Sequence, residues 1–428
     1  MISRLNMKID WLALFLIIVP TFWVVNIDLR LAQANMFHIG VFAMIAFLHV
    51  NQYIKYFLLY VLAQYLIFPQ LPISFFQIEC LFMGALAYHM IVKYVEPERL
   101  KFYLWIMLGF LAFNCFWALL QAWNIDPVFS LTNPDKQADG FSAGVGFLGL
   151  PAMFGNYAAA MVPIALLLMP VSVGFCLIAL WLAKSTFSVI AAVLAGAFFL
   201  WFKKRIMFWA VMIFGGITIL CYVAFTDMPS GQFNRRFAAW HQILIQAFKT
   251  QWIGKGFGSL STAYCFSEVT PTHIVKMTNN ERDFVDFVKQ QAVLNSSNDV
   301  TRLLSGIDIT KLKTDAIRPD VFASISEGMQ HFNMDVHCWK EAHNEFIQVL
   351  FETGLIGLFL MIAYVWDMFR RFYLFGTKST FCITMASCFL AIVIVSIGHF
   401  PFHVARLAVP FLTIAAFFEL GLLRAENP

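Results

Sequence analysis

Long apolar runs recur from one end of this sequence to the other, and they constrain the fold more than any other feature. Runs of about 17 residues or more can cross the hydrocarbon core of a bilayer as helices. The runs are continuous rather than alternating, which favours helices over a β-barrel. Only 13% of the side chains are charged and 60% are hydrophobic, which is too little polar surface for a soluble protein of 428 residues. We therefore predict an all-α integral membrane protein.

The apolar runs predict about twelve transmembrane helices and three regions. Residues 1–226 hold nine helices and a short periplasmic loop near 124–150, residues 227–344 form a large periplasmic loop domain, and residues 345–428 hold the last three helices. Because a structureless loop of that length is unusual, we expect the large loop to fold as a helical cap. The predicted spans cover about 11–27, 31–49, 53–68, 72–92, 101–122, 151–169, 171–183, 186–202, 206–226, 345–366, 380–399 and 405–423.

Basic residues concentrate at one set of span ends, and this bias predicts the orientation. With the N-terminus in the cytoplasm, most lysines and arginines outside the large loop fall at cytoplasmic ends. We expect a bacterial inner-membrane protein with both termini cytoplasmic and the first span uncleaved. Of the eight cysteines, only Cys265 and Cys338 lie in the long polar segment, and their spacing leaves open whether they form a disulfide.

The strongest local motif is His343-Asn344, where the large loop returns to the membrane. Histidine titrates near neutral pH, so His343 could take a proton from a hydroxyl group. The alternative is structural: His343 lies at the interface, and Asn344 caps the helix that follows. Sequence alone leaves both interpretations open, and we carry His343 and Asn344 forward as the candidate catalytic residues.

A second group comprises Arg235, Arg236 and Trp240, followed by three glycines at 254, 256 and 258. An arginine guanidinium fits phosphate oxygens, and glycines let backbone amides approach an anion. In the structural alternative, the arginines reach lipid headgroups and Gly254, Gly256 and Gly258 form a turn.

Further candidate residues stand alone. Lys184 and Arg406 lie at predicted periplasmic span ends, where a cation would meet a lipid phosphate or anchor its helix. Glu79 is an acid inside a span, which indicates either function or pairing with a neighbouring helix. The histidines around residues 331–343 match no zinc spacing, and Pro401 between His399 and His403 indicates a turn, so we predict no metal site.

Together these motifs resemble the O-antigen ligase and polymerase superfamily, which includes bacterial protein O-oligosaccharyltransferases. The resemblance covers roughly residues 140–400. It rests on His343-Asn344 with the trailing Glu352, Gly354 and Gly357, on Arg236 to Trp240, on the glycine turn, and on Gly155-Asn156-Tyr157-Ala158 at the start of a span.

The resemblance implies a GT-C-like, metal-independent transferase that moves a glycan from undecaprenyl pyrophosphate to a hydroxyl at the periplasmic face. His343 would activate the acceptor, and Arg236 would hold the pyrophosphate with help from Arg235, Lys184 and Arg406. The family usually has a Ser-Arg pair where this chain reads Ser185-Thr186, which puts that part of the phosphate clamp in question. No cofactor is expected beyond the donor lipid.

Several functions share this chemistry. The chain's size and the lack of a further domain after the last span favour ligation to a lipid A core over transfer to protein. Polymerisation of repeat units is an alternative, and a transporter of lipid-linked sugar is a further one. A transporter would need charges near the midplane and matching broken helices, and neither is evident. Expected partners are the donor lipid, the hydroxyl acceptor and membrane lipids, with no nucleic acid.

Overall fold

The computed structural model describes most of the predicted membrane region. It describes residues 49–67, 72–123, 148, 151–225, 240, 243–245, 247–248, 252–257, 259–260, 342–399, 401–403 and 405–427. Every regular element within these ranges is a helix. The first two predicted spans, residues 124–147 and most of the large loop lie outside them.

The helices follow the predicted apolar runs closely. Each run that falls in the described ranges is an α-helix with ends near the predicted ones, and the run from Glu345 continues to Arg371. The elements are α3 (Gln52–Ile67), α4 (Pro72–Tyr94), η2 (Pro97–Arg99), α5 (Leu100–Ala122), α8 (Pro151–Leu168), η4 (Pro170–Ser172), α9 (Val173–Ala183), α10 (Thr186–Lys203), α11 (Arg205–Phe225), α18 (Glu345–Arg371), η7 (Phe372–Gly376), α19 (Thr380–Gly398), η8 (Pro401–His403) and α20 (Ala405–Glu426).

Five of the described helical stretches are long and apolar enough to cross a membrane. They are Leu100–Ala122, Thr186–Lys203, Glu345–Gly376, Thr380–Gly398 and Leu407–Glu426, and shorter apolar helices accompany them. The fold is therefore all-helical with several helices able to span a bilayer, as the composition predicts. Prolines inside α8 and α20 are tolerated, as expected for helices with close neighbours.

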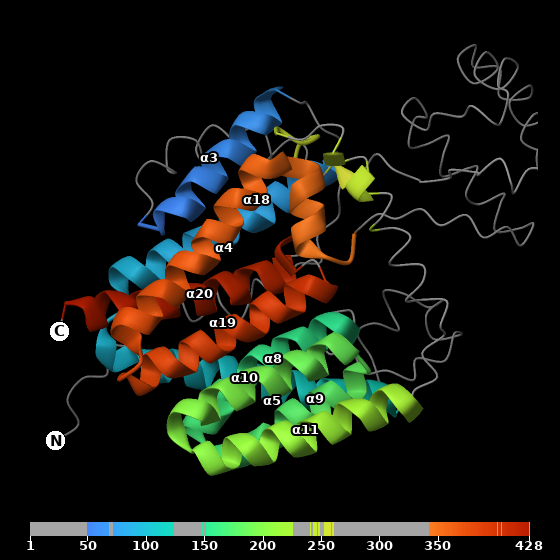
Figure 1. Ribbon diagram of the computed structural model, residues 1–428, viewed down its shortest axis with the longest axis vertical. Coiled ribbons are helices and arrows are strands. Elements are labelled where there is room, and N and C mark those ends of the chain that lie inside the picture. The colour runs from blue at the N-terminus through green and yellow to red at the C-terminus, as the bar shows by residue number, and fades with distance from the viewer. Residues whose placement is uncertain are drawn as a thin grey trace, which may run out of the picture.

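Small residues hold the middle of the bundle together. In α8, Ala158, Ala159 and Ala160 are completely buried, and α8 packs against α5, α9, α10 and α19 (Figure 1). A Cβ atom at Gly155 would lie only 2.8 Å from the Ser188 hydroxyl oxygen and 2.9 Å from the Ala183 side chain. Small side chains permit such a close approach of two helices. In a bilayer the lipid tails are as apolar as the side chains, so close packing rather than the hydrophobic effect drives helix association.

The outer helices differ from the central ones in how much they bury. In the apolar stretch of α20, 89% of the residues are buried inside the bundle, and in that of α19, 72% are buried. By contrast, α11 packs mainly on α10 and leaves Trp209, Phe214 and Ile217 exposed. An apolar helix with an apolar exposed face is suited to contact with lipid.

The two ends of the bundle carry different charge. Hydrogen bonds from Lys203 to Thr380 and from Arg424 to the Val95 carbonyl bring the ends of several helices together. That end, called the basic end below, carries Lys55, Lys93, Arg99, Lys101, Lys203, Lys204, Arg205, Arg370, Arg371, Lys378 and Arg424. At the opposite end, the described residues include few basic positions, namely Lys184, Lys255 and Arg406.

Candidate functional site

A break in α18 shapes the end of the bundle that has few basic residues. Gly354 has φ 64° and ψ −165° inside the helix, a conformation almost restricted to glycine. The first part of α18, residues 345–353, therefore bends sharply away from the second part, residues 355–371 (Figure 1). The break also removes helical hydrogen bonds, so nearby carbonyl groups need other donors.

The glycine turn supplies part of those donors. The Gly256 amide donates to the Glu352 carbonyl at 2.7 Å, and the Lys255 amide donates to the Phe351 carbonyl at 3.2 Å. Gly254 and Gly256 have positive φ, and a Cβ at Gly254 would collide with the α18 backbone at Glu352. The glycines form a turn that approaches α18 closely, and the Lys255 and Gly256 amides donate to α18.

Two side chains of α3 complete the support of the break. The Tyr60 hydroxyl donates to the Thr353 carbonyl at 3.1 Å and lies 2.9 Å from the Ile253 carbonyl. The Gln64 amide donates to the Glu352 carbonyl at 3.3 Å and also contacts Ile253. The C-terminal side of the first part of α18 is thus held from α3 and from the glycine turn together.

A buried histidine joins the two turns of the first part of α18. His403 Nδ1 lies 2.8 Å from Glu345 Oε1, and its Nε2 lies 2.7 Å from Glu352 Oε2. All three side chains are at most 1% exposed, and the Phe257 ring stacks on the imidazole at 4.6 Å. We call Glu345, His403 and Glu352 the acid–histidine clamp.

The charge state of the clamp follows from its geometry. Burial alone would lower the pKa of His403, but the Glu345 and Glu352 carboxylates outweigh it and raise that pKa to about 10. His403 is therefore an imidazolium at neutral pH; its Nε2 donates to Glu352, and its Nδ1 lies beside the Glu345 carboxylate. A histidine in this state cannot accept a further proton.

Backbone and amide donors satisfy the remaining carboxylate oxygens of the clamp. The Phe402 amide donates to Glu345 Oε2 at 3.2 Å, and the Leu260 amide donates to Glu352 Oε1 at 3.3 Å. The Gln348 side chain donates to the same Glu352 oxygen at 3.2 Å. Buried carboxylates need such partners, and three of the four carboxylate oxygens of the clamp have a hydrogen-bond donor.

His343 and Asn344 lie directly before the clamp. The Asn344 side chain accepts from the Ile347 amide at 3.1 Å, which is the predicted helix cap. His343 is half-buried and has φ 48°, an uncommon conformation for a non-glycine residue. The Trp240 indole donates to the Ala342 carbonyl at 2.6 Å, so the predicted Trp240 contacts the residue preceding His343.

The turn between α9 and α10, which contains Lys184 and Ser185, is connected to the start of α18 by His399. Ser185 Oγ is 3.4 Å from His399 Nε2, and the His399 carbonyl accepts from the Glu345 amide at 3.0 Å. Lys184 itself ends α9 in a left-handed conformation and is exposed. Ser188 donates to Asn156 at 2.7 Å, which ties this corner to α8.

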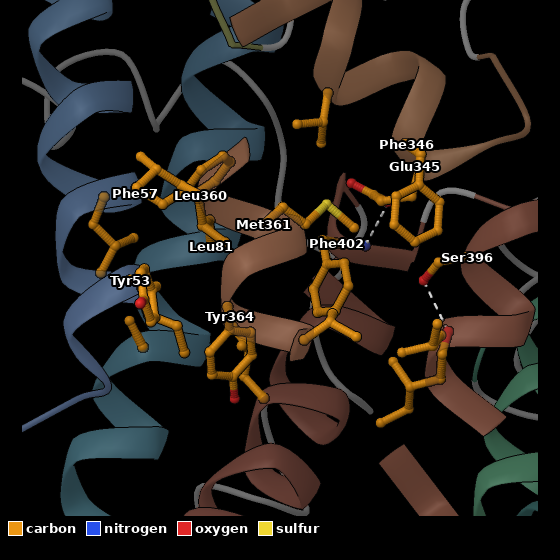
Figure 2. Close-up of a pocket in the computed structure, with 18 of the residues that line it drawn as sticks. Tyr53, Phe57, Leu81, Glu345, Phe346, Leu360, Met361, Tyr364, Ser396 and Phe402 are labelled. Carbon is orange, nitrogen blue, oxygen red and sulfur yellow. Dashed lines mark hydrogen bonds between the residues drawn. The ribbon is translucent and has the colours of Figure 1, made fainter. Parts of the chain in front are cut away.

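An apolar groove lies between α3, α4, α18, α19 and α20 (Figure 2). Glu345, Phe346, Phe257 and Phe402 line it at the clamp, and the rest of its lining is almost entirely apolar. Lining side chains such as Phe57 and Leu360 are partly exposed, so the groove is open to the surface of the bundle. Its apolar lining suits an apolar chain.

The structure brings several predicted residues to one end of the bundle. His343, Asn344, Trp240, Gly254 and Gly256 surround the start and the break of α18, and Lys184 is connected to them through Ser185 and His399. The remaining candidates are only partly described. Arg406 and Glu79 lie in the described helices α20 and α4 without a described side chain, and Arg235, Arg236, Gly258, Cys265 and Cys338 lie outside the described residues.

The acid–histidine clamp was missed by sequence reasoning. A signal existed, because Glu345 and Glu352 are acids seven residues apart in an apolar run and so share one helix face. The bend predicted from Pro401 is confirmed as the 3₁₀ turn η8, which places His403 on the clamp while His399 faces Ser185. The two histidines thus have separate partners.

In comparisons with known proteins, no protein family matches this sequence and no curated protein resembles it significantly.

Proposed function

We propose that this protein is a membrane glycosyltransferase that moves a glycan from undecaprenyl pyrophosphate to an acceptor hydroxyl, acting as an O-antigen ligase does. The observation that carries the proposal is the apolar groove that ends at Glu345, two residues from His343. A lipid-linked donor needs a place for its tail beside a place for its reacting headgroup. The motifs that resemble those of the ligase and polymerase superfamily support the same reaction.

The reaction assigns a role to each group. His343 accepts the proton of the acceptor hydroxyl while the acceptor oxygen attacks the anomeric carbon of the donor sugar. The bond from that carbon to the pyrophosphate oxygen breaks, and undecaprenyl pyrophosphate leaves with the electron pair. Positive side chains stabilise the charge that develops on the leaving group, and Arg235, Arg236, Lys184 and Arg406 are the candidates.

The structure favours His343 over His403 as the base. His403 is enclosed between two carboxylates with its pKa raised to about 10, so it is already protonated at neutral pH. His343 is half-buried in the segment that leads into α18, where an acceptor could reach it. Since a general base must begin unprotonated, His343 is the histidine suited to the role.

The charge difference between the two ends supports a periplasmic site in the bacterial inner membrane. Lysines and arginines accumulate on the cytoplasmic side of inner-membrane proteins. The basic end of the bundle would then face the cytoplasm, and α18 would begin on the periplasmic side. In this orientation, the lipid-linked donor and the acceptor meet His343 at the periplasmic face.

The direct test is to identify the lipid-linked glycans that accumulate in a strain lacking this protein. Mass analysis of the polyprenyl carrier should find full-length polymer, because donor is made but not consumed. Single repeat units on the carrier would instead make the protein a polymerase. A normal carrier pool together with normal surface glycan would contradict the glycosyltransferase proposal.

A further inference from the structure

The break at Gly354 raises the question of what fixes the first part of α18. In a continuous helix, the position of the long membrane-spanning part would also fix the position of the first turn. Here the backbone direction changes at Gly354, so residues 345–353 need contacts of their own. Tyr60, Gln64 and the glycine turn hold carbonyls of residues 351–353, at the break itself.

The start of the first part is held from another direction. The His399 carbonyl accepts from the Glu345 amide, and the Phe402 amide donates to the Glu345 carboxylate. Both groups belong to the corner between α19 and α20. His403 lies in this same corner, and it contacts both Glu345 at the start and Glu352 near the break.

We propose that His403 is a positioning residue that fixes the first part of α18 to the α19–α20 corner and thereby places His343 for catalysis. Glu345 and Glu352 are two helical turns apart on one face, so one imidazole joined to both fixes the orientation and the axial position of this short helix. Asn344 caps the same helix, and His343 precedes it directly. This inference rests on the proposed function of His343.

The test compares four proteins in a transfer assay with undecaprenyl-pyrophosphate-linked glycan: the natural sequence, His403→Gln, His343→Ala and the double variant. Glutamine at 403 keeps a polar group of similar length but can join only one carboxylate. We expect His403→Gln to lower kcat by roughly 100-fold, the cost of a small misplacement of a catalytic group, with the KM for donor nearly unchanged. In the His343→Ala background it should cost nothing further.

Two results would overturn the proposal. One is a further large loss in the double variant, because it would mean that His403 acts independently of His343. The other is a kcat for His403→Gln equal to that of the natural protein. Should His403→Gln fail to fold, Glu345→Gln tests the same link, because it keeps an acceptor for His403 at the start of the helix; a kcat unchanged there would also count against the proposal.

A second measurement does not depend on the reaction. A nitroxide attached to a His343→Cys variant should give a narrower electron paramagnetic resonance line when His403→Gln is added, because the segment before α18 gains mobility. An identical line shape would reject the positioning role even if the protein is a glycosyltransferase. A narrower line together with no transferase activity in the natural protein would reject the proposed function and leave the clamp in place.

Discussion

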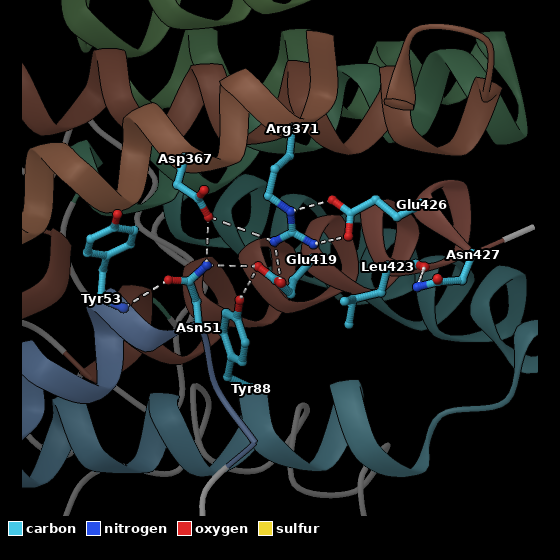
Figure 3. Close-up of polar contacts among 9 residues, drawn as sticks. All are labelled: Asn51, Tyr53, Tyr88, Asp367, Arg371, Glu419, Leu423, Glu426 and Asn427. Carbon is cyan, nitrogen blue, oxygen red and sulfur yellow. Dashed lines mark hydrogen bonds and ion pairs between the residues drawn. The ribbon is translucent and has the colours of Figure 1, made fainter. Parts of the chain in front are cut away.

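Charged side chains are buried at both ends of the helix bundle, and the two groups are built differently. At the basic end, Arg371 pairs with Glu419 and Glu426 and lies 3.9 Å from Asp367, while Asn51 links Asp367 to Glu419 (Figure 3). Arg371 is 14% exposed and Glu426 is 21% exposed. At the other end, His403 and its two carboxylates are at most 1% exposed.

The difference lies in what each group connects. The Arg371 group joins the residue before α3 to the C-terminal parts of α18 and α20, and its arginine reaches Glu426 with two donors. The acid–histidine clamp instead holds a short helix that has been cut from its continuation at Gly354. Burial of charge is therefore a poor guide to function on its own, and the clamp is notable because it lies beside an interrupted helix and His343.

The largest expected effect is loss of transfer in His343→Ala. Removing a general base typically costs about 10² to 10⁴ in rate. Assays of purified protein with lipid-linked donor should show this loss, while the apparent melting temperature and the elution volume stay those of the natural protein. Transfer at the normal rate in this variant would show that His343 is not the base. It would also leave no reason to assign catalysis to one end of the bundle and not to the other.

Next in size is Gly354→Ala, which attacks the break itself. Alanine is strained at φ 64° and ψ −165°, and its Cβ would collide with the Trp252 carbonyl. We expect a loss of about 3 kcal/mol in stability together with lost transfer. The matched control is Gly109→Ala in α5, where a Cβ meets nothing within 4 Å; equal melting temperatures for the two variants would argue against a strained break.

At the basic end, Arg371→Gln should lower stability and spare the chemistry. Breaking a buried ion pair costs several kcal/mol, and partial exposure of Arg371 reduces this to about 2 kcal/mol. The melting temperature should therefore fall, while transfer per folded molecule stays unchanged. A selective loss of kcat in this variant would show that the two ends are coupled, contrary to a purely structural role for Arg371.

The clamp also contributes a pH dependence to the stability of the protein. Because folding raises the pKa of His403 from its ordinary 6.5 to about 10, the imidazolium stabilises the folded protein fully below pH 6.5. This contribution is lost as pH rises toward 10, at no more than about 1.4 kcal/mol per pH unit. The natural protein should lose melting temperature over this range more steeply than His403→Gln, and parallel curves would exclude a charged clamp.

Among the described residues, the sequence predicts the helices well and the contacts between them poorly. Apolar runs locate the helices, and Asn344 is readable as a cap, because both signals are local in the chain. The clamp depends on Glu352 and His403, which are far apart in sequence and meet only because η8 turns the chain back. No local pattern shows which helix face meets which turn.

The break at Gly354 was hidden for a similar reason. A glycine in an apolar run, with Gly357 one turn later, usually indicates close helix packing. The backbone of Trp252 and Gly254, brought there by the glycine turn, shows why no side chain fits at 354. For the same reason the sequence leaves open whether Gly254 and Gly256 face an anion or form a turn, and the structure shows that Lys255 and Gly256 donate their amides to the broken helix.

The smallest predicted effect separates the two roles that sequence left open for Asn344. In the structure its side chain accepts from the Ile347 amide, so Asn344→Ala should cost about 1 kcal/mol of stability. Asn344→Asp keeps the accepting oxygen and should restore both melting temperature and transfer. If aspartate restores the melting temperature but leaves kcat at the alanine level, the amide nitrogen of Asn344 takes part in the reaction, and the catalytic group at this end is larger than His343 alone.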